Sequence, residues 1–187
     1  MAQRPVPNPA ARRRTLCLAA SLALLDPMAV FGQAALRSLA VVPPDFLDEQ
    51  RNPATAEAQT RRLLEVHAGL QRELAARGLY RVVDFAPAQA LLDKLRSQQE
   101  YMHRCPDCAV QLGRQLGTEL VMVTWVQKVS ELILNVNVEI YDVASERSLL
   151  SKSVDMRGND DVSWQRSVRY LVRDMAEKRE RNPRYGQ

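Results

Sequence analysis

The stretch ELVMVTWVQKVSELILNVNVEIYDV, residues 119–143, carries the clearest strand patterns of the sequence. Its first part, residues 119–129, is apolar on both faces at its centre, which is typical of a strand buried inside a sheet. Its second part, residues 132–143, alternates between apolar and polar residues, which indicates a strand with one wet face. Because a short link joins the two parts, the sequence predicts neighbouring antiparallel strands. The wet face of the second strand carries Asn135, Asn137, Glu139 and Tyr141.

Downstream of this pair, the sequence predicts one more strand and a final helix. Residues 147–158 follow a tight turn at Ser145 and Glu146, and they continue the antiparallel meander. The helix begins near residues 159–161, where an Asn or Asp side chain can cap it. Its apolar positions recur at helical spacing, which predicts that they pack on the sheet: Trp164, Val168, Leu171, Val172 and Met175.

Upstream of the pair, short apolar runs alternate with helical patterns. Strands are predicted at 36–42 and 79–85, and helices at 55–77, 87–97 and 109–117. Helical crossovers join parallel strands, whereas short turns join antiparallel ones. We therefore predict a mixed α/β fold of the α+β-like kind. Its five-stranded sheet has a parallel first part and an antiparallel meander, with the helices mainly on one face.

The first 34 residues are typical of an export signal. Four arginines precede an apolar segment at residues 15–25, and small residues lead to a cleavage site after Ala34. The apolar segment is too short to cross a bilayer, which needs about 20 residues. We expect a Sec signal, although Arg13 and Arg14 also resemble a twin-arginine signal. The mature protein is then periplasmic or secreted, without a stable membrane anchor.

The charge of the mature chain gives no sign of nucleic-acid binding. Four of the 26 Lys and Arg residues and one of the 22 Asp and Glu residues lie in the signal, which leaves a net charge of +1. Such a balance is typical of an ordinary soluble protein. Residues 35–187 are long enough for a single α/β domain, and residues 177–187 are expected to form a charged, fraying tail.

The segment HRCPDC, residues 103–108, holds the two cysteines that remain after cleavage. An exported protein with an even number of cysteines usually pairs them, so we expect a local disulfide between Cys105 and Cys108. Two alternatives stay open. The pair could exchange thiols, although no strand is predicted before it. It could also bind copper or zinc together with His103.

An acidic segment follows the first predicted strand. Its residues Asp45, Asp48 and Glu49 lie where open α/β sheets bind ligands, so they could face a cation or a partner. A solvated loop explains them more simply. The polar row from Asn135 to Tyr141 is a second candidate contact surface. No phosphate loop, dinucleotide fingerprint, nucleophile elbow or paired-histidine zinc motif occurs, so we predict no catalytic residues and no cofactor.

Several segments together resemble a bacterial family of predicted secreted proteins of unknown function. They are LAVVPPDFLDE, YRVVDFAP, CPDC, residues 116–143 and residues 153–175. More loosely, the order of strands and helices is similar to the N-terminal domain of TolB, a periplasmic binding module without catalysis. The resemblance implies a non-catalytic accessory or binding protein with a periplasmic protein partner or small ligand. It also implies a setting near periplasmic quinoprotein alcohol oxidation.

Overall fold

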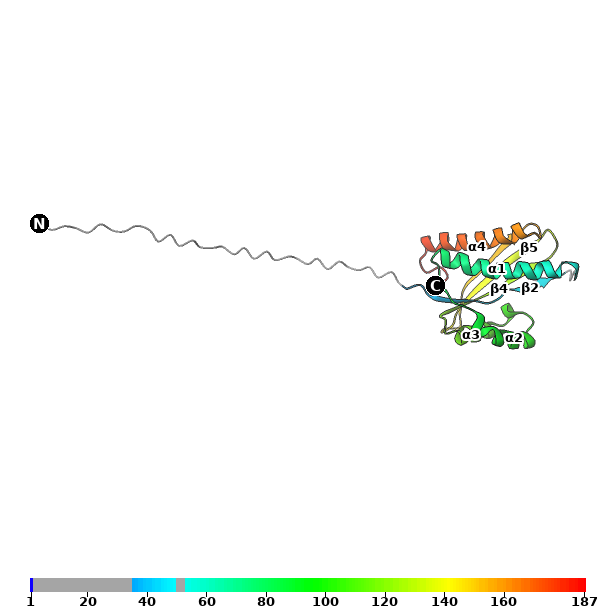
Figure 1. Cartoon of the computed structure of the whole chain (residues 1–187), viewed down its shortest axis with the longest axis horizontal. Helices are drawn as coiled ribbons and strands as arrows, with labels where there is room; N and C mark the ends of the chain where they lie inside the picture. Colours follow the sequence, from blue (N-terminus) through cyan, green and yellow to red (C-terminus); the bar gives the residue numbers. More distant parts are fainter. Residues whose placement is uncertain (2–34, 50–52) are drawn as a thin grey trace. The chain divides into compact units, whose positions relative to one another are not determined.

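The computed structural model describes Met1 and residues 35–49 and 53–187 (Figure 1). The predicted signal peptide and its cleavage site lie outside these residues, apart from Met1, and stay predictions. None of the helices that the structure describes combines the length and the apolar character needed to span a bilayer.

One mixed sheet organises the molecule. Its strands follow the order β3-β1-β4-β5-β6. β1 pairs in parallel with β3 and β4, whereas β4, β5 and β6 form an antiparallel meander. The predicted mixed α/β fold, with its parallel first part, is therefore confirmed. The bounds are Ser38–Val41 for β1, Arg81–Val82 for β3, Leu120–Lys128 for β4, Leu134–Asp142 for β5 and Ser148–Met156 for β6.

A sixth strand, β2, lies in the segment that the sequence predicted to be an acidic loop. β2 covers Asp45–Asp48 and pairs in parallel with the second half of β4, from Trp125 to Lys128. Pro43 and Pro44 end β1 because proline has no N–H to donate to the ladder. β4 extends beyond β1, so the chain resumes pairing with β4 after the prolines.

The helices divide between the two faces of the sheet, although they were expected mainly on one. Helices α1 (Ala56–Ala76) and α4 (Asp161–Arg181) lie side by side on one face, and α2 (Gln89–Gln98) and α3 (Pro106–Gln115) lie on the other (Figure 1). The reason is that β1 and the first half of β4 are apolar on both faces. Ala40 and Val121 belong to the core beneath α2 and α3, whereas Leu39 and Leu120 belong to the core beneath α1 and α4.

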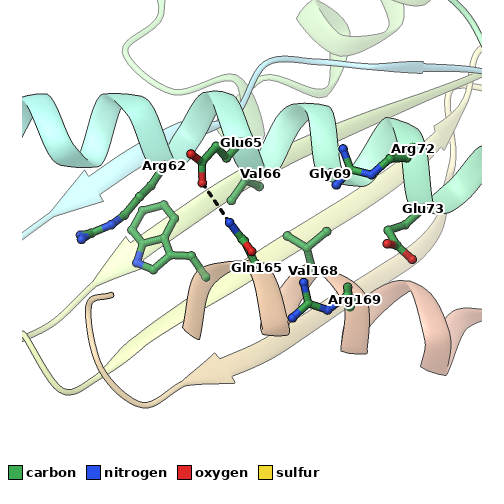
Figure 2. A pocket seen from close by; sticks show the side chains of 10 residues that line it. Arg62, Glu65, Val66, Gly69, Arg72, Glu73, Gln165, Val168 and Arg169 are labelled. Atoms are coloured by element: carbon green, nitrogen blue, oxygen red, sulfur yellow. Dashed lines mark hydrogen bonds between the residues drawn. The ribbon is translucent and has the colours of Figure 1, made fainter. Parts of the chain in front are cut away.

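Helix α4 packs on the sheet through the predicted apolar stripe. Trp164, Leu171 and Met175 are all buried in the core that the apolar residues of β4, β5 and β6 form beneath α1 and α4. α1 and α4 also approach each other closely, because a Cβ at Gly69 would lie 3.4 Å from Val168 Cγ1 (Figure 2). The cleft left between the two helices has a volume of only about 40 Å³, so it accommodates a few water molecules rather than a ligand.

The C-terminal segment is part of the fold, which corrects the expectation of a fraying tail at residues 177–187. α4 continues to Arg181, and Tyr185 packs against the main core. Arg179 donates hydrogen bonds to the carbonyl oxygens of Leu79 and Tyr185, at 2.6 and 3.0 Å. Tyr80 donates a further bond to the Gly186 carbonyl. The charge of this segment suggested solvation, but Arg179 instead binds carbonyl groups that would otherwise lack donors.

His67 makes the stability of this fold dependent on pH. Its Nε2 lies 2.9 Å from the carbonyl oxygen of Val41, to which the neutral ring donates, and burial lowers the pKa of His67 from its ordinary value of 6.5. Below that pH the unfolded chain binds a proton that the folded chain does not, so the free energy of unfolding should fall. Replacing His67 by glutamine, which does not titrate, should reduce this dependence, which His103 shares, in denaturant melts below about pH 6.5. An unchanged slope would contradict the assignment.

Candidate functional site

A row of polar side chains crosses the sheet on the face opposite α1 and α4. It begins with the predicted row of β5, whose apolar neighbours point into the core. The strand registers place Trp125 of β4 beside Asn137, and Ser153 of β6 on the other side of Asn137. Residues that share a register share a face of the sheet. We call this surface the polar face, and it consists of Trp125, Asn135, Asn137, Glu139, Tyr141, Ser151, Ser153 and Asp155.

The segment Tyr101–Cys108 covers one end of the polar face. The ring of His103 stacks on Trp125, with centroids 4.5 Å apart and ring planes at 15°. Tyr101 lies beside His103, at 5.7 Å between centroids. Burial lowers the pKa of His103, although Asp45 acts in the opposite direction. The covered end is therefore aromatic and partly dry, whereas Ser151, Ser153 and Asp155 at the β6 end are exposed.

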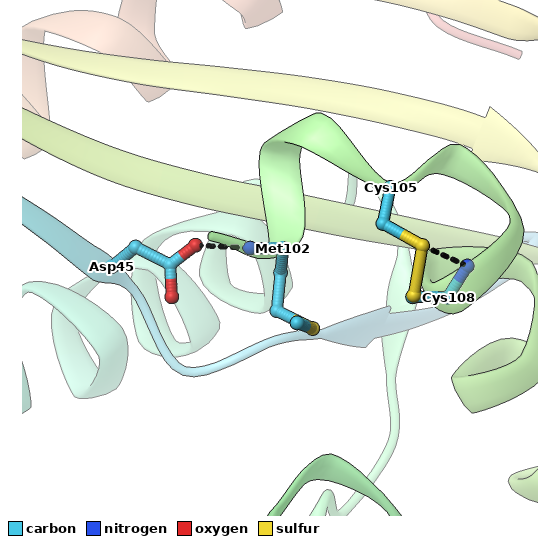
Figure 3. The surroundings of a disulfide bond; sticks show 4 residues. All are labelled: Asp45, Met102, Cys105 and Cys108. Carbon is cyan, nitrogen blue, oxygen red and sulfur yellow. Dashed lines mark hydrogen bonds between the residues drawn. A yellow bond between two sulfur atoms is a disulfide. The ribbon is translucent and has the colours of Figure 1, made fainter. Parts of the chain in front are cut away.

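Asp45 holds the covering segment in place. Its Oδ2 accepts a hydrogen bond from the backbone N–H of Met102 at 2.6 Å (Figure 3). Its Oδ1 accepts one from Arg96 at 2.9 Å. Arg96 also donates to the carbonyl oxygen of Pro43 at 2.8 Å. Only 5% of the Asp45 side chain is exposed, so its carboxylate is occupied by bonds within the chain. Asp45 thus connects β2, α2 and the covering segment.

Cys105 and Cys108 form the expected disulfide at the start of α3 (Figure 3). The Sγ of Cys105 also accepts a hydrogen bond from the backbone N–H of Cys108 at 3.2 Å, so Cys105 caps the helix. Among the described residues, no group of three or more His, Cys, Asp and Glu side chains could hold a metal ion. In this structure His103 contacts Trp125 and Asp45.

Replacing both Cys105 and Cys108 by serine should lower the free energy of unfolding by about 2 kcal/mol. The ring that the bond closes is short, so its effect on the entropy of the unfolded chain is small. Urea melts of the parent and of the double variant, both without reductant, measure the difference. Reductant should bring the parent to the stability of the variant and leave the variant unchanged. Equal stability without reductant would show that the bond does not stabilise the protein.

The three predicted acidic residues do not form one cluster. Asp45 faces the covering segment, as described above. Asp48 pairs with Lys128, at 3.4 Å, and the Lys128 side chain is fully buried. Glu49 is exposed and accepts a hydrogen bond from Gln127 at 2.9 Å. Asp45 and Asp48 lie on opposite faces of β2, since successive side chains of a strand point to opposite faces, and Glu49 follows the end of the strand.

The predicted polar row is only partly accessible. Asn137 and Tyr141 are 8% and 5% exposed, and Asn137 donates a hydrogen bond to Asn135. Burial, together with a hydrogen bond to Glu139, raises the pKa of Tyr141. Asn135 and Glu139 are half-buried and reach the surface. The accessible part of the polar face therefore lies at Asn135 and Glu139 and on β6.

Sequence reasoning missed the contribution of β6. Ser151, Ser153 and Asp155 alternate with Leu150, Lys152 and Val154, and this is the same signal that identified the wet face of β5. Trp125 was also missed, because it lies in a segment that is apolar on both faces. Its place beside Asn137 depends on the register between β4 and β5, which the sequence does not specify.

Fold and surface together define a small α/β protein with an open mixed sheet and one partly covered polar face. The chain belongs to the family DUF3280, described as "Protein of unknown function (DUF2380)", whose model matches residues 37–175. This result confirms the expected family of unknown function. No curated protein shows a significant sequence match.

Several solved structures have a similar fold. LpoB from E. coli is 12% identical, and the match covers 85% of this chain and 88% of LpoB with a TM-score of 0.44. The hypothetical protein CT253 from Chlamydia trachomatis is 14% identical, with coverages of 78% and 99% and a TM-score of 0.49. TolB from Acinetobacter baumannii is 12% identical, with coverages of 80% and 29% and a TM-score of 0.44. Because all three TM-scores lie below 0.5, these matches carry no conclusion about this chain.

Proposed function

We propose that this chain is an exported, non-catalytic accessory protein that binds a protein partner through the polar face. One observation carries the proposal. The polar face is covered at its Trp125 end by the segment that Asp45 and the disulfide hold in place, and Tyr141 lies in the core beneath α2 and α3. The β6 end, with Ser151, Ser153 and Asp155, stays open to solvent.

The chemistry of this surface favours a protein partner over a small ligand. Protein interfaces combine aromatic anchors with a polar rim. Here the stacked rings of Trp125 and His103, with Tyr101 tilted beside them, lie next to hydroxyl, amide and carboxylate groups. A small ligand instead needs a concave site that encloses most of its surface. Exposed polar side chains on a sheet provide hydrogen bonds without such enclosure.

The setting of this function follows from the signal and from the resemblance. We propose a periplasmic or secreted protein without a resident cofactor, without nucleic acid as a partner, and associated with periplasmic quinoprotein alcohol oxidation. The mature chain should begin near Ala35, and N-terminal sequencing of the exported protein tests this. A retained leader in a membrane fraction would contradict export with cleavage.

Site-specific crosslinking tests the partner. A photoreactive residue at Ser153 should give one discrete adduct with a second protein in the native compartment. The same residue at Ala90, which is exposed on α2 and is not part of the polar face, is the matched control and should give none. A charge reversal at Glu139 should reduce the adduct at Ser153. Equal crosslinking at both positions, or none at Ser153, would overturn the proposed function.

A second function, thiol–disulfide exchange, is favoured by one feature. Cys105 caps the N-terminus of α3, and a helix N-terminus stabilises a thiolate. Cys105 is half-buried, whereas Cys108 is almost fully buried. A redox titration and an insulin-reduction assay separate the two functions. Turnover that is lost in Cys105→Ser would favour an oxidoreductase, and absence of turnover would favour a structural disulfide.

A further inference from the structure

β6 is an edge strand with few of the features that protect such edges. It is the last strand in the order of the sheet and pairs only with β5 among the described strands. It is nine residues long and contains no proline, and its one irregularity lies near its start, where Leu149 is left out of the register with β5. Proteins usually block a long edge with proline, a bulge or outward charges, because its free N–H and C=O groups attract another strand. Lys152 is the one lysine of β6, and it points toward α4, where it pairs with Asp174.

A groove runs along β6 on the side of α4. It has a volume of about 540 Å³, and residues of both elements line it. Val154 and Met156 of β6 provide an apolar floor, while Arg166 and Tyr170 of α4 form the opposite wall. Tyr170 is 46% exposed, and the guanidinium of Arg173 lies over its ring, 5.3 Å from the centroid.

The groove is positively charged. Arg157 and Arg166 are both exposed, and neither side chain forms an ion pair or a hydrogen bond with the part of the chain that the structure describes. The carboxylate of Asp174, which lies further along α4, is already shared between Lys152 and Lys178. Asp155 is the only acidic residue that lines the groove, and its strand position directs it to the polar face.

These charges decide between two kinds of occupant. If a second copy of this chain paired antiparallel with β6, the two α4 helices would approach each other and bring their arginines together. Like charges in contact cost free energy, so self-association through this edge is unfavourable. A strand with carboxylates directed at Arg157 and Arg166 would instead form charge-assisted hydrogen bonds.

We propose that the β6 edge binds an extended acidic segment of the partner by strand addition. The inference rests on the proposed function, since it gives the chemistry of the partner and the mode in which it binds. Main-chain hydrogen bonds to β6 would provide affinity, and alternate side chains would provide specificity. Every second residue of the segment points to α4 and should be acidic, whereas its neighbours point toward Ser153 and Asp155 and should be neutral.

Synthetic peptides test this pattern directly. The probe is a fluorescent peptide of about eight residues in which glutamate and threonine alternate, a length typical of strands. One control has the same composition with the glutamates grouped together, and another has lysine in place of glutamate. A third control carries N-methyl groups on its backbone, which remove the donors for strand pairing. We expect the alternating acidic peptide to bind about tenfold more tightly than each of the three controls.

Two protein variants test where on the chain the peptide binds. Arg166→Glu should weaken binding of the alternating peptide about tenfold or more, because it replaces attraction by repulsion. Arg169→Glu is the matched control, since Arg169 is an exposed arginine of the same helix that faces α1, and it should change binding far less. Circular dichroism of both variants confirms that they fold.

Each outcome has a definite meaning. Equal binding of the alternating and grouped peptides would overturn strand addition, and equal binding of the lysine peptide would overturn the acidic specificity. Binding too weak to measure with every peptide, or a dimer of the chain that Arg166→Glu does not affect, would also overturn the inference. Crosslinking at Ser153 that persists in any of these cases would leave the proposed function standing without the acidic strand.

Discussion

Replacing Trp164 by alanine is expected to lower the free energy of unfolding by about 3–5 kcal/mol. Trp164 is 1% exposed and lies at the start of α4, where its ring is 6.0 Å from that of Phe46 on β2. Its Nε1 donates a hydrogen bond to Asn159 Oδ1 at 3.0 Å. Truncation removes the burial of a large ring, leaves a cavity and removes one of two donors to Asn159 Oδ1, which also accepts a hydrogen bond from Arg62.

The same helix provides a control for Trp164→Ala. Arg169 lies on α4 but is exposed, so Arg169→Ala should change stability by less than about 0.5 kcal/mol. A domain of this size is stable by about 5–15 kcal/mol, so the tryptophan variant should be close to unfolding. Urea melts followed by circular dichroism compare the two variants with the parent. If Trp164→Ala melts with the parent, the ring is not part of the core.

The sequence predicted the central meander because each of its signals is local. The alternation in β5 identifies both of its faces, and the helical spacing of Trp164, Leu171 and Met175 identifies the buried side of α4. These patterns depend only on the period of the strand or helix that contains them. The mixed sheet followed because short links favour antiparallel pairing and helical crossovers favour parallel pairing.

The features that were missed depend on contacts between distant segments. β2 forms because β4 is long enough to offer it a partner, and the segment itself carries two prolines before it and two acidic residues within it. The C-terminal segment is held by Arg179, which reaches Leu79 across the fold. In both cases the residue types suggested solvation, and the bonding partner lies far away in the sequence.

In the candidate site, too, the features with a local sequence signal were predicted, and the features that depend on distant contacts were missed. The wet face of β5 was predicted, but its accessible part was not, because the cover over Asn137 comes from the segment after α2. The disulfide was predicted from the number of cysteines and the export signal. The role of the disulfide beside the polar face could not be predicted, because the position of the covering segment depends on Asp45 and on the stacking of His103.

Asp45 leads to the last prediction, since its carboxylate joins three parts of the fold. Asp45→Ala should lower the free energy of unfolding by about 2–4 kcal/mol, because it leaves the buried N–H of Met102 without an acceptor and removes a charge-assisted bond to Arg96. Arg96 is 31% exposed and can bind water instead, which limits its share of the loss. Asp155→Ala, at an exposed carboxylate of β6, should cost less than about 0.5 kcal/mol.

Hydrogen exchange separates a local effect of Asp45 from a global one. In Asp45→Ala the amide of Met102 should exchange faster than the amides of the central strand β4, because only the covering segment loses its anchor. If the polar face must be pre-organised to bind, the same variant should also weaken crosslinking at Ser153, although Asp45 itself is too deeply buried to contact a partner. Unchanged protection of the Met102 amide from exchange would show that its hydrogen bond to Asp45 does not fix the covering segment. The covered end of the polar face would then not be pre-organised for a partner.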